Sequence, residues 1–410
     1  MKILMIAPTP FFSHRGTHIR IFEEARALEA RGHEIKILTY HVGDDIHKYV
    51  ETDIDVRRIR RWLFWYQKTA AGGGGDWQKV ILDLFLIRKV LWMTFFWKPD
   101  VIHGHLHEGV IIGRITQLLF FWRRSLRLVA DFHGSLVGEM RSHGYFKESL
   151  VTRFFKYIEY RISRMGNAAI VSSADNVDKI RDARTDRLAY HIFDGVDLAN
   201  YGSLHTEKRQ LRDKYGIAEE KTVIVYTGGL VHNKGVQNIL DAAAHLAEDR
   251  HAKDLHFVIG GDAGGWVEKF VEVKNLQNIF TVIYPLNYFN LPQINALADI
   301  AIDPKNMQSK QASGKILQYG AAHTAIICAD RKTNRAYIGE AGIYIEKLTA
   351  RSLADKILNV ANDSSMQRKK ASDAYKAMEG YSWKNVGKRI EGVYRAVGVR
   401  KIKKEEIVLE

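Results

Sequence analysis

The sequence has very little cysteine and no uninterrupted apolar run long enough to cross a membrane. Its single cysteine, Cys328, excludes a disulfide framework and a zinc site with two or more thiolates. The longest apolar stretch, residues 80–97, contains Asp83, Arg88 and Lys89, whereas a spanning helix needs about 20 mostly uncharged residues. The apolar run at the N-terminus is too short for a signal-peptide core. We therefore expect a cytoplasmic protein without a transmembrane segment.

Acidic residues are also fewer than basic residues. The 410 residues include 61 Lys and Arg against 47 Asp and Glu, which gives a formal net charge of +14. With 46% apolar and 26% charged residues the chain is expected to fold, and its length predicts two domains. The basic excess favours an anionic partner such as lipid headgroups, nucleic acid or phosphorylated substrates. The basic runs stand at 57–61, 123–127, 207–213 and 400–404.

Apolar runs alternate with helical patterns in the first half of the chain. KILMIA at 2–7 predicts a strand, and the segment 17–31 predicts a helix that ends at Gly32. Near-continuous apolar strands separated by helices are typical of a parallel sheet that is covered on both faces. The first half is therefore predicted to form one α/β domain. Its further strands are expected at 34–40, 100–105, 126–132 and 168–173.

The same alternation begins again after residue 220. A helix is predicted at 235–247, and the domain boundary is expected around 195–220. Four consecutive glycines within AAGGGGD at 70–76 predict a mobile loop before an aromatic-rich stretch. The fold class is therefore α/β, with two doubly wound parallel sheets. The strands of the second sheet are expected at 221–228, 255–261, 279–285 and 298–304.

Two common phosphate-binding motifs, G-x-G-x-x-G and G-x-x-x-x-G-K-[ST], are absent, so neither a nicotinamide-cofactor site nor a P-loop is supported. Glycines nevertheless follow the first strand of each half, where ligands of doubly wound sheets bind. Gly16 precedes a helix, whose first N–H groups can face an anion. Gly228, Gly229 and Lys234 stand in the corresponding loop of the second half. The alternative is an ordinary turn in each case and a surface charge at Lys234.

A series of motifs along nearly the whole chain resembles a known family, the retaining GT-B-fold glycosyltransferases of the family 4 type, which use nucleotide sugars. The resemblance implies two Rossmann-like domains that face each other across a cleft. It assigns residues 1–197 to acceptor binding, 198–380 to nucleotide-sugar binding, 381–398 to a helix that returns to the first domain, and 399–410 to a tail. The motifs are RGHEIKILT (31–39), KPDVIHGH (98–105), ADFHGS (130–135), FDGVD (193–197), YTGGLVHNKGV (226–236), VIGGDAGG (258–265), LADIAIDP (297–304), SGKILQYGAA (313–322) and YSWKNVGKRIEGVY (381–394).

The resemblance also assigns roles to individual residues. His133 would contact the transferred sugar, and Lys234 would neutralise the diphosphate, so that these two are the expected catalytic residues. In this scheme the leaving diphosphate takes the acceptor proton, and neither a metal nor another cofactor is required. The remaining donor-binding residues implied by the family are Gly16, Gly228, Gly229, Asp262, Tyr284, Leu286, Ser313, Gly314, Lys315 and Gln318.

The chain departs from the family pattern at three positions. Family members commonly carry two glutamates eight positions apart, where this sequence has Lys310 and Gln318. The Gln318 carbonyl can still accept a hydrogen bond from a ribose hydroxyl, but Lys310, at a sugar-contact position, cannot replace a carboxylate. Family members also often have an arginine where Gly229 stands. Candidates for a second cation are Arg15, Lys315 and Arg331.

Two further patterns suggest ligands of a different kind. His103, His105 and His107 fall on one side of an extended segment and form a possible metal face, for which the alternative is a strand end beside the cleft. Aromatic and basic residues interleave between positions 80 and 122, which suits an anionic membrane surface; the alternative is core packing with a basic outer face. The aromatic residues are Phe85, Trp92, Phe95, Phe96, Trp97, Phe120, Phe121 and Trp122, and the basic ones Arg88, Lys89, Arg123 and Arg124.

The sequence as a whole predicts a retaining glycosyltransferase, peripheral at the inner face of a membrane, that moves a hexose-type sugar from a nucleotide sugar to a lipid-linked or growing glycan. Such an enzyme would serve cell-surface polysaccharide assembly. The alternatives are a catalytically impaired nucleotide-sugar-binding protein and a GT-B-like sugar-nucleotide epimerase. A basic nucleic-acid-binding protein is a further alternative, but no nucleic-acid-binding module is present, so no nucleic-acid partner is expected.

Overall fold

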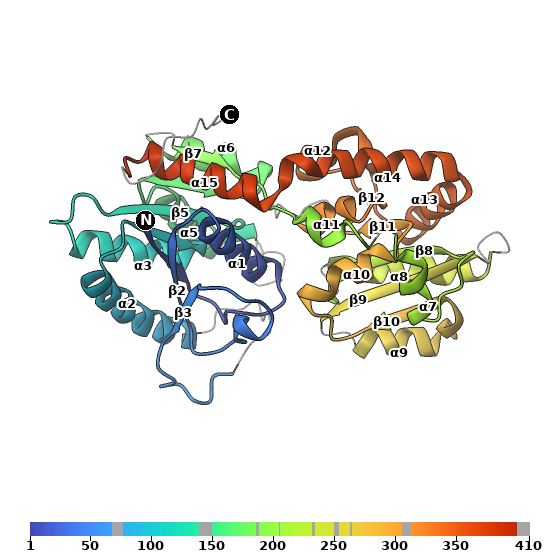
Figure 1. Cartoon of the computed structure of the whole chain (residues 1–410), viewed down its shortest axis with the longest axis horizontal. Coiled ribbons are helices and arrows are strands. Elements are labelled where there is room, and N and C mark those ends of the chain that lie inside the picture. The colour runs from blue at the N-terminus through green and yellow to red at the C-terminus, as the bar shows by residue number, and fades with distance from the viewer. Residues whose placement is uncertain are drawn as a thin grey trace. The chain divides into compact units, whose positions relative to one another are not determined.

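The computed structural model describes residues 1–67, 77–138, 150–185, 188–204, 206–231, 234–249, 254–262, 265–305 and 313–399. These residues form two compact units. One unit runs from Met1 to Asp194 and takes in the chain again from Trp383, and the other runs from Gly195 to Ser382 (Figure 1). The glycine-rich segment 70–76, for which a mobile loop was expected, lies outside the described residues.

The first unit is built on a parallel sheet of seven strands in the order β3-β2-β1-β4-β5-β6-β7. The central strands β1, β4 and β5 consist almost entirely of buried residues, because helices cover both faces of the sheet. The strands are β1 (Lys2–Ala7), β2 (Glu34–Thr39), β3 (Asp55–Arg58), β4 (Val101–His105), β5 (Arg127–Phe132), β6 (Ala168–Val171) and β7 (Ala189–His191).

Helices α1, α2, α3, α5, α6 and α15 lie beside this sheet in the described part of the chain. The buried sides of α2 and α3 pack in a core with β1 and β2, which includes Leu4, Leu38, Leu86 and Ile112. None of the helices within the described residues combines the length and apolar character needed to cross a bilayer. The helices are α1 (Gly16–Glu29), α2 (Trp77–Trp97), α3 (Leu106–Leu119), α5 (Leu150–Ser163), α6 (Ala174–Ala183) and α15 (Trp383–Ala396).

The second unit has a parallel sheet of six strands in the order β10-β9-β8-β11-β12-β13. The strands are β8 (Thr222–Gly229), β9 (Leu255–Asp262), β10 (Phe280–Ile283), β11 (Ile300–Asp303), β12 (Ala325–Ala329) and β13 (Ile343–Ile345). The helices are α7 (Lys208–Lys214), α8 (Val236–Ala247), α9 (Gly265–Val273), α10 (Leu291–Ala296), α11 (Lys315–Ala321), α12 (Lys332–Ile338), α13 (Ala350–Asn362) and α14 (Ser364–Met378).

The last helix, α15, belongs to the first unit, where it packs on α1. A Cβ atom at Gly387 would lie 3.1 Å from the Ala27 side chain, so glycine allows the two helices to approach closely. Glu391 forms an ion pair with Arg31, at 2.7 Å, and is hydrogen-bonded to Nε2 of His33, at 2.5 Å, just before β2. Residues more than 350 positions apart in the sequence are thereby joined.

The two α/β sheets expected from the sequence are confirmed, but four strands were not predicted. β3 (DVRR) and β7 (AYH) are short and polar, so they lack the apolar run on which the prediction rests. β13 (IYI) has only three residues, and β12 (AIICA), although fully buried and apolar, was overlooked. The predicted helix 17–31 ends at Glu29, before Gly32 adopts a φ of +82°.

Candidate active site

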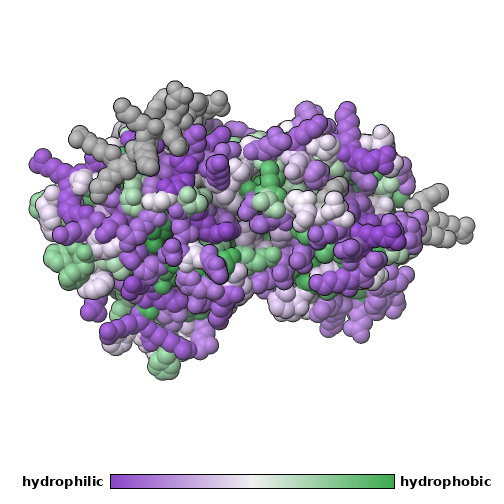
Figure 2. All heavy atoms as spheres, viewed as in Figure 1, coloured by the Kyte–Doolittle hydropathy of each residue, from purple (hydrophilic) through white to green (hydrophobic). Residues whose placement is uncertain are grey.

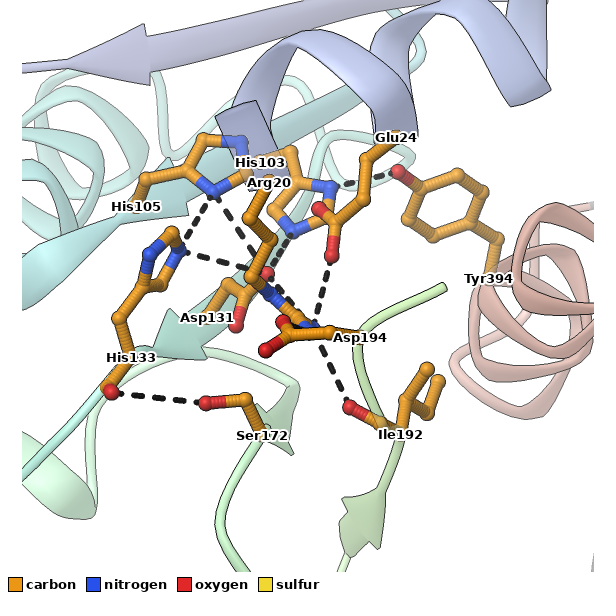
Figure 3. Close-up of polar contacts among 10 residues, drawn as sticks. All are labelled: Arg20, Glu24, His103, His105, Asp131, His133, Ser172, Ile192, Asp194 and Tyr394. Carbon is orange, nitrogen blue, oxygen red and sulfur yellow. Dashed lines mark hydrogen bonds and ion pairs between the residues drawn. The ribbon is translucent and has the colours of Figure 1, made fainter. Parts of the chain in front are cut away.

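Asp131 is the centre of a buried polar network in the first unit (Figure 3). It stands next to last in β5 and is fully buried. Its Oδ2 lies 3.5 Å from Nε2 of His103, 3.5 Å from Nδ1 of His105 and 3.8 Å from Nε2 of His133. The two histidines of β4 stack with their ring centroids 4.4 Å apart, and His105 Nδ1 is 3.2 Å from His133 Nε2. Neighbouring parallel strands thus bring three imidazoles to one carboxylate.

Arg20 reaches the same carboxylate from α1. Its guanidinium forms ion pairs with Glu24 at 2.7 Å, with Asp194 at 2.7 Å and with Asp131 at 3.6 Å. It also donates to the backbone carbonyl of Ile192 at 3.3 Å. Arg20 and Glu24 are buried although charged residues on helices usually face water. One cation therefore binds three carboxylates from α1, β5 and the segment after β7.

The surroundings shift the pKa values of the two fully buried carboxyl groups in opposite directions. Burial opposes ionisation of Asp131, but the charge of Arg20, followed by interactions with the neighbouring histidines, holds its pKa well below the usual value. Burial, only partly offset by Arg20 and reinforced by the nearby Asp131, raises the pKa of Glu24 well above its usual value. Of the two groups, Asp131 is therefore the one whose ionised form the network favours.

Two histidines of the network, His105 and His133, are expected to be neutral near pH 7. Burial, followed by the charge of His103, lowers the pKa of His105 to about 4. Burial also lowers the pKa of His133 well below its usual value, although Asp131 acts in the opposite direction. A neutral imidazole has one donor and one acceptor nitrogen, so His133 can hydrogen-bond a sugar hydroxyl in either sense.

Four residues of the network could geometrically hold a metal ion. One ligand atom each of Glu24, His103, His105 and Asp131 lies within 4.8 Å of the others. His107, the third histidine of the metal face considered from the sequence, is not part of this group. Its ring packs against Phe132, with the two ring centroids 5.3 Å apart. The Arg20 guanidinium, 2.7 Å from Glu24, already places one positive charge beside this group.

A second group of charged residues lies in the second unit, around the end of β11. Asp303, the last residue of β11, is fully buried, and its Oδ1 is 3.8 Å from the Lys315 ammonium. The same ammonium lies 4.2 Å from the centroid of the Tyr226 ring. Lys305 is 8% exposed; burial, followed by the charge of Lys234, lowers its pKa well below the usual value.

The charges near Lys305 are mostly of one sign. Besides Lys234, the charges of Arg331 and Lys315 lower the pKa of Lys305, whereas Asp303 acts in the opposite direction. We call these five residues, Lys234, Asp303, Lys305, Lys315 and Arg331, the cation cluster. Several basic side chains close to one another favour an anion at this place.

Two glycines make room for this cluster. Gly228, at φ +143°, would place a Cβ atom 2.9 Å from the Lys315 nitrogen. Gly235, at φ +81°, precedes α8, and a Cβ atom there would lie 2.0 Å from the carbonyl oxygen of Pro304, next to Lys305. Larger side chains at these positions would displace Lys315 and the segment that carries Lys305.

The other predicted donor residues of the second unit fall into two groups. Gly229 pairs in register with Asp262 at the ends of β8 and β9, and the Leu286 amide donates to the Gly261 carbonyl at 2.9 Å. Tyr284, 46% exposed, stands two residues before Leu286. The second group is at α11, where Gly314 is the N-cap, Ser313 is buried, Lys315 begins the helix and Gln318 is half-buried.

The predicted residues do not all belong to one unit. Gly16, the exposed first residue of α1, and His133 belong to the first unit, whereas the described predicted residues from Gly228 to Gln318 belong to the second. Within the second unit the structure brings Gly228 and Lys315 together and, through Lys305, associates them with Lys234. Lys310 lies outside the described residues.

Several charged residues of the two clusters were not predicted. A sequence signal exists for Asp131 and Asp303, because each is an acidic residue near the end of an otherwise apolar strand, LRLVADF and ADIAIDP. An aspartate buried in a strand needs a polar partner, so both positions mark a site. Arg20, Glu24, Asp194 and Lys305 carry no comparable signal.

Comparison with known proteins identifies the class to which this architecture belongs. Residues 14–200 match the family model described as Glycosyltransferase Family 4, and residues 207–377 match the model described as Glycosyl transferases group 1. The two matches follow each other along the chain and correspond closely to the two sheets. The chain belongs to the GT-B-fold glycosyltransferases of the family 4 type.

Three individual proteins illustrate the likeness. The chain is 25% identical over 223 residues to alpha-D-kanosaminyltransferase of Streptomyces kanamyceticus; the match covers 53% of this chain and 55%, about half, of that relative. Sucrose-phosphate synthase of Thermosynechococcus elongatus superposes with a TM-score of 0.78 at 13% identity, over 97% of this chain and 98% of that one. HepE of Anabaena, solved with UDP-glucose, gives a TM-score of 0.73 at 15% identity, over 97% and 100%.

Proposed function

We propose that this glycosyltransferase moves a sugar, with retention of configuration, from a nucleotide-sugar donor to an acceptor, and that its second unit binds the donor. The observation that carries the proposal is the cation cluster, in which the charges of Lys234, Lys315 and Arg331 act on the buried Lys305 and Lys315 lies 3.8 Å from Asp303. A bound diphosphate would bring negative charge to these basic side chains. The UDP-glucose complex of HepE supports a donor of this chemical type.

The cluster also suits the chemistry of transfer. Breaking the bond between the sugar C1 and the diphosphate leaves negative charge on the departing oxygen. Preorganised cations stabilise that charge, and each such contact lowers the barrier by about 3 kcal/mol. The leaving diphosphate can then accept the proton of the acceptor hydroxyl, so the proposed scheme needs no metal or other cofactor. The neutral His133 imidazole would orient a hydroxyl of the transferred sugar.

Calorimetric titration tests donor binding. Purified protein is titrated with UDP, GDP, ADP and dTDP, in the wild type and in Lys234→Ala. We expect one nucleotide to bind selectively and the variant to bind it about tenfold more weakly, because one charge-assisted contact is lost. A Lys347→Ala variant, which removes an exposed cation of the same unit, serves as the control. Equal affinities in all three proteins would exclude Lys234 from the site, and no binding of any nucleotide would contradict the proposed function.

We further propose that the acceptor is lipid-linked and that the first unit binds an anionic membrane surface. Large apolar side chains project from the segment after β3, along α2 and at the end of α3, and green spheres mark α2 at the left edge of Figure 2. Exposed basic residues, including Arg60, Arg61, Arg88 and Arg124, lie among them. The exposed apolar residues are Trp62, Phe64, Trp65, Trp77, Val80, Leu84, Trp92, Phe95, Phe96, Leu118, Leu119, Phe121 and Trp122.

The structure separates these residues from the core. Of the eight aromatic residues considered from the sequence, Trp92, Phe95, Phe96, Phe121 and Trp122 are exposed by more than half. Phe85 and Trp97 are half-buried, and Phe120 is buried, so core packing accounts for these three. An exposed surface of aromatic and basic side chains matches the chemistry of a bilayer interface with anionic lipids.

Co-sedimentation with vesicles tests the membrane proposal. The triple variant Trp92→Ser, Phe95→Ser, Phe96→Ser should bind anionic vesicles severalfold more weakly than the wild type, since it loses apolar area that would enter the interface. Val273→Ser, at a residue 68% exposed in the second unit, is the control. The melting temperature of the triple variant should stay unchanged, because its three side chains are exposed. Undiminished vesicle binding by the folded triple variant would contradict this surface assignment.

A further inference from the structure

Three arginines of the first unit converge on a cavity of about 480 Å³. Arg114 comes from α3, Arg161 from α5, and Arg164 from the turn between α5 and β6. Met165 and Gly166 complete the lining, and none of these described lining residues is acidic. We call this cavity the arginine pocket.

The three guanidinium groups hydrogen-bond only neutral groups among the described residues. Arg114 donates to the Gln117 side chain at 2.8 Å. Arg161 donates to the hydroxyl of Tyr157 at 2.9 Å, and Arg164 to that of Tyr160 at 3.3 Å. Other arginines of the same unit, by contrast, bind carboxylates, as Arg20 and Arg31 do. The positive charge of the arginine pocket is therefore left without a countercharge from the described part of the chain.

The arginines are also held in place. Arg161 and Arg164 lie over the rings of Tyr157 and Tyr160, with centroid distances of 5.8 and 5.6 Å. Each tyrosine precedes its arginine by four residues, which on a helix brings the two side chains together. The positions of these two guanidinium groups are thus set before any ligand arrives.

Arg114 is fixed by a chain of hydrogen bonds that reaches the sheet. Its acceptor, Gln117, donates in turn to the side chain of Asn167 at 2.8 Å. The same Asn167 oxygen accepts from the backbone amide of Leu128 in β5 at 2.9 Å. Gly166, at φ +81°, would place a Cβ atom 3.0 Å from the Leu128 carbonyl oxygen, so glycine permits the turn that brings Asn167 into this position.

The arginine pocket is separate from the candidate active site. Gly166 and Asn167 precede β6, and Leu128 is the second residue of β5, so the pocket adjoins the amino ends of these parallel strands. His133 follows the carboxyl end of β5. The two sites therefore lie at opposite ends of the strands of one sheet. A donor or a transferred sugar bound at His133 would not explain the three arginines of the pocket.

We propose that the arginine pocket binds a phosphate group. Guanidinium groups present planar forks of N–H donors that match phosphate oxygens, and several arginines together can satisfy one phosphate or diphosphate. The phosphate could be borne by a lipid headgroup or by a soluble phosphorylated molecule. Exposed apolar side chains next to the lining residues, Leu118 on α3 and Phe154 and Tyr157 on α5, suit a headgroup that is followed by acyl chains.

The test compares two triple variants with the same change in net charge. The pocket variant carries Arg114→Gln, Arg161→Gln and Arg164→Gln. The control variant carries Arg351→Gln, Arg368→Gln and Lys369→Gln, three exposed cations of the second unit. Both proteins and the wild type are tested with phosphatidylcholine vesicles with and without 20 mol% phosphatidic acid, and by calorimetry with inorganic diphosphate in the presence of saturating UDP. The UDP keeps diphosphate from the cation cluster.

We expect the pocket variant to bind phosphate at least about tenfold more weakly than the wild type and the control variant. A loss confined to phosphatidic acid vesicles identifies a lipid headgroup, and a loss of diphosphate binding identifies a soluble ligand. Equal binding by the pocket and control variants, or no binding of either probe by the wild type, would overturn the proposal. A third variant with lysine at all three positions keeps the positive charge but loses the planar forks of N–H donors. It should bind phosphate more weakly than the wild type.

This result does not depend on the proposed transferase function. The readout is the difference between two variants whose substitutions lie outside the cation cluster. UDP affinity should be the same in the wild type, the pocket variant and the control variant. If no nucleotide binds, the proposed function fails while the vesicle comparison still decides the role of the arginine pocket.

Discussion

The two units each contain a cluster of charged residues next to a buried aspartate, but the clusters differ in how their charges are balanced. In the first unit, Arg20 is surrounded by three carboxylates and three imidazoles, and these groups contact one another directly. In the second unit, the charges of Lys234, Lys315 and Arg331 act on the buried Lys305, and Lys315 lies 3.8 Å from Asp303. The first cluster joins opposite charges in direct contact, whereas the second gathers several side chains of one sign. An excess of positive charge therefore marks the second cluster as a place for an anionic ligand.

The largest effect is expected when Arg20, the cation of the network around Asp131, is replaced. Arg20→Met would leave Glu24, Asp131 and Asp194 without their shared partner, and loss of one partner from a buried ion pair costs about 3–5 kcal/mol. Urea denaturation of the wild type and the variant measures this loss of unfolding free energy. Asp330→Asn, which breaks the exposed pair of Asp330 and Arg335, should cost less than about 1 kcal/mol. Equal losses in the two variants would contradict the structural importance of the network.

Replacement of a basic residue by methionine should have the opposite consequence in the cation cluster. Lys305→Met removes a buried cation that lies among other cations, so the unfolding free energy should stay the same or rise. Nucleotide binding, in contrast, should weaken by about tenfold because one phosphate contact is lost. Denaturation and calorimetry on one protein preparation measure both quantities. A destabilised variant with unchanged nucleotide affinity would show that the cation cluster is structural.

A smaller effect concerns the pH dependence of the first unit. The pKa of His105 is about 4 in the folded chain, below its usual value of 6.5. The unfolded chain therefore takes up the proton first as the pH falls, and between pH 6.5 and about pH 4 this histidine lowers stability by up to about 1.4 kcal/mol for each pH unit. His105→Gln should remove that contribution. Denaturation at pH 6.5 and 5.5 should thus show a smaller loss in the variant.

The exposed His47 offers a matched control for this measurement. Because its ring faces water, His47→Gln should leave the difference in unfolding free energy between pH 6.5 and 5.5 close to that of the wild type. A His105 variant that loses as much stability on acidification as the His47 variant would show that His105 is not kept neutral by the network.

The sequence predicts most of the central strands of the two sheets but not all of their edge strands. Central strands such as β1 and β5 are evident from their apolar runs, because both faces of a parallel sheet are covered. The edge strand β3 consists of polar and charged residues, apart from one valine, so its pairing with β2 has no signal in the local composition. Edge strands depend on a neighbour more than on their own sequence.

The charged clusters show a similar limit. Asp131 and Asp303 could have been found, since each interrupts an apolar strand. Arg20 and Glu24 could not, because a charged pair four residues apart is usual on the solvent face of a helix, and burial of α1 depends on α15 from the far end of the chain. A local pattern cannot reveal a partner that follows more than 350 residues later.

The hydrogen bond between Tyr394 and His103, at 2.7 Å, also has a consequence for the order in which the protein is made. Ribosomes synthesise the first 194 residues and then the whole second unit before α15 emerges. Until then the imidazole of His103 lacks its tyrosine partner, and α1 lacks the helix that packs on it. The unit that is translated first is therefore completed last, because its final helix is made only after the whole second unit.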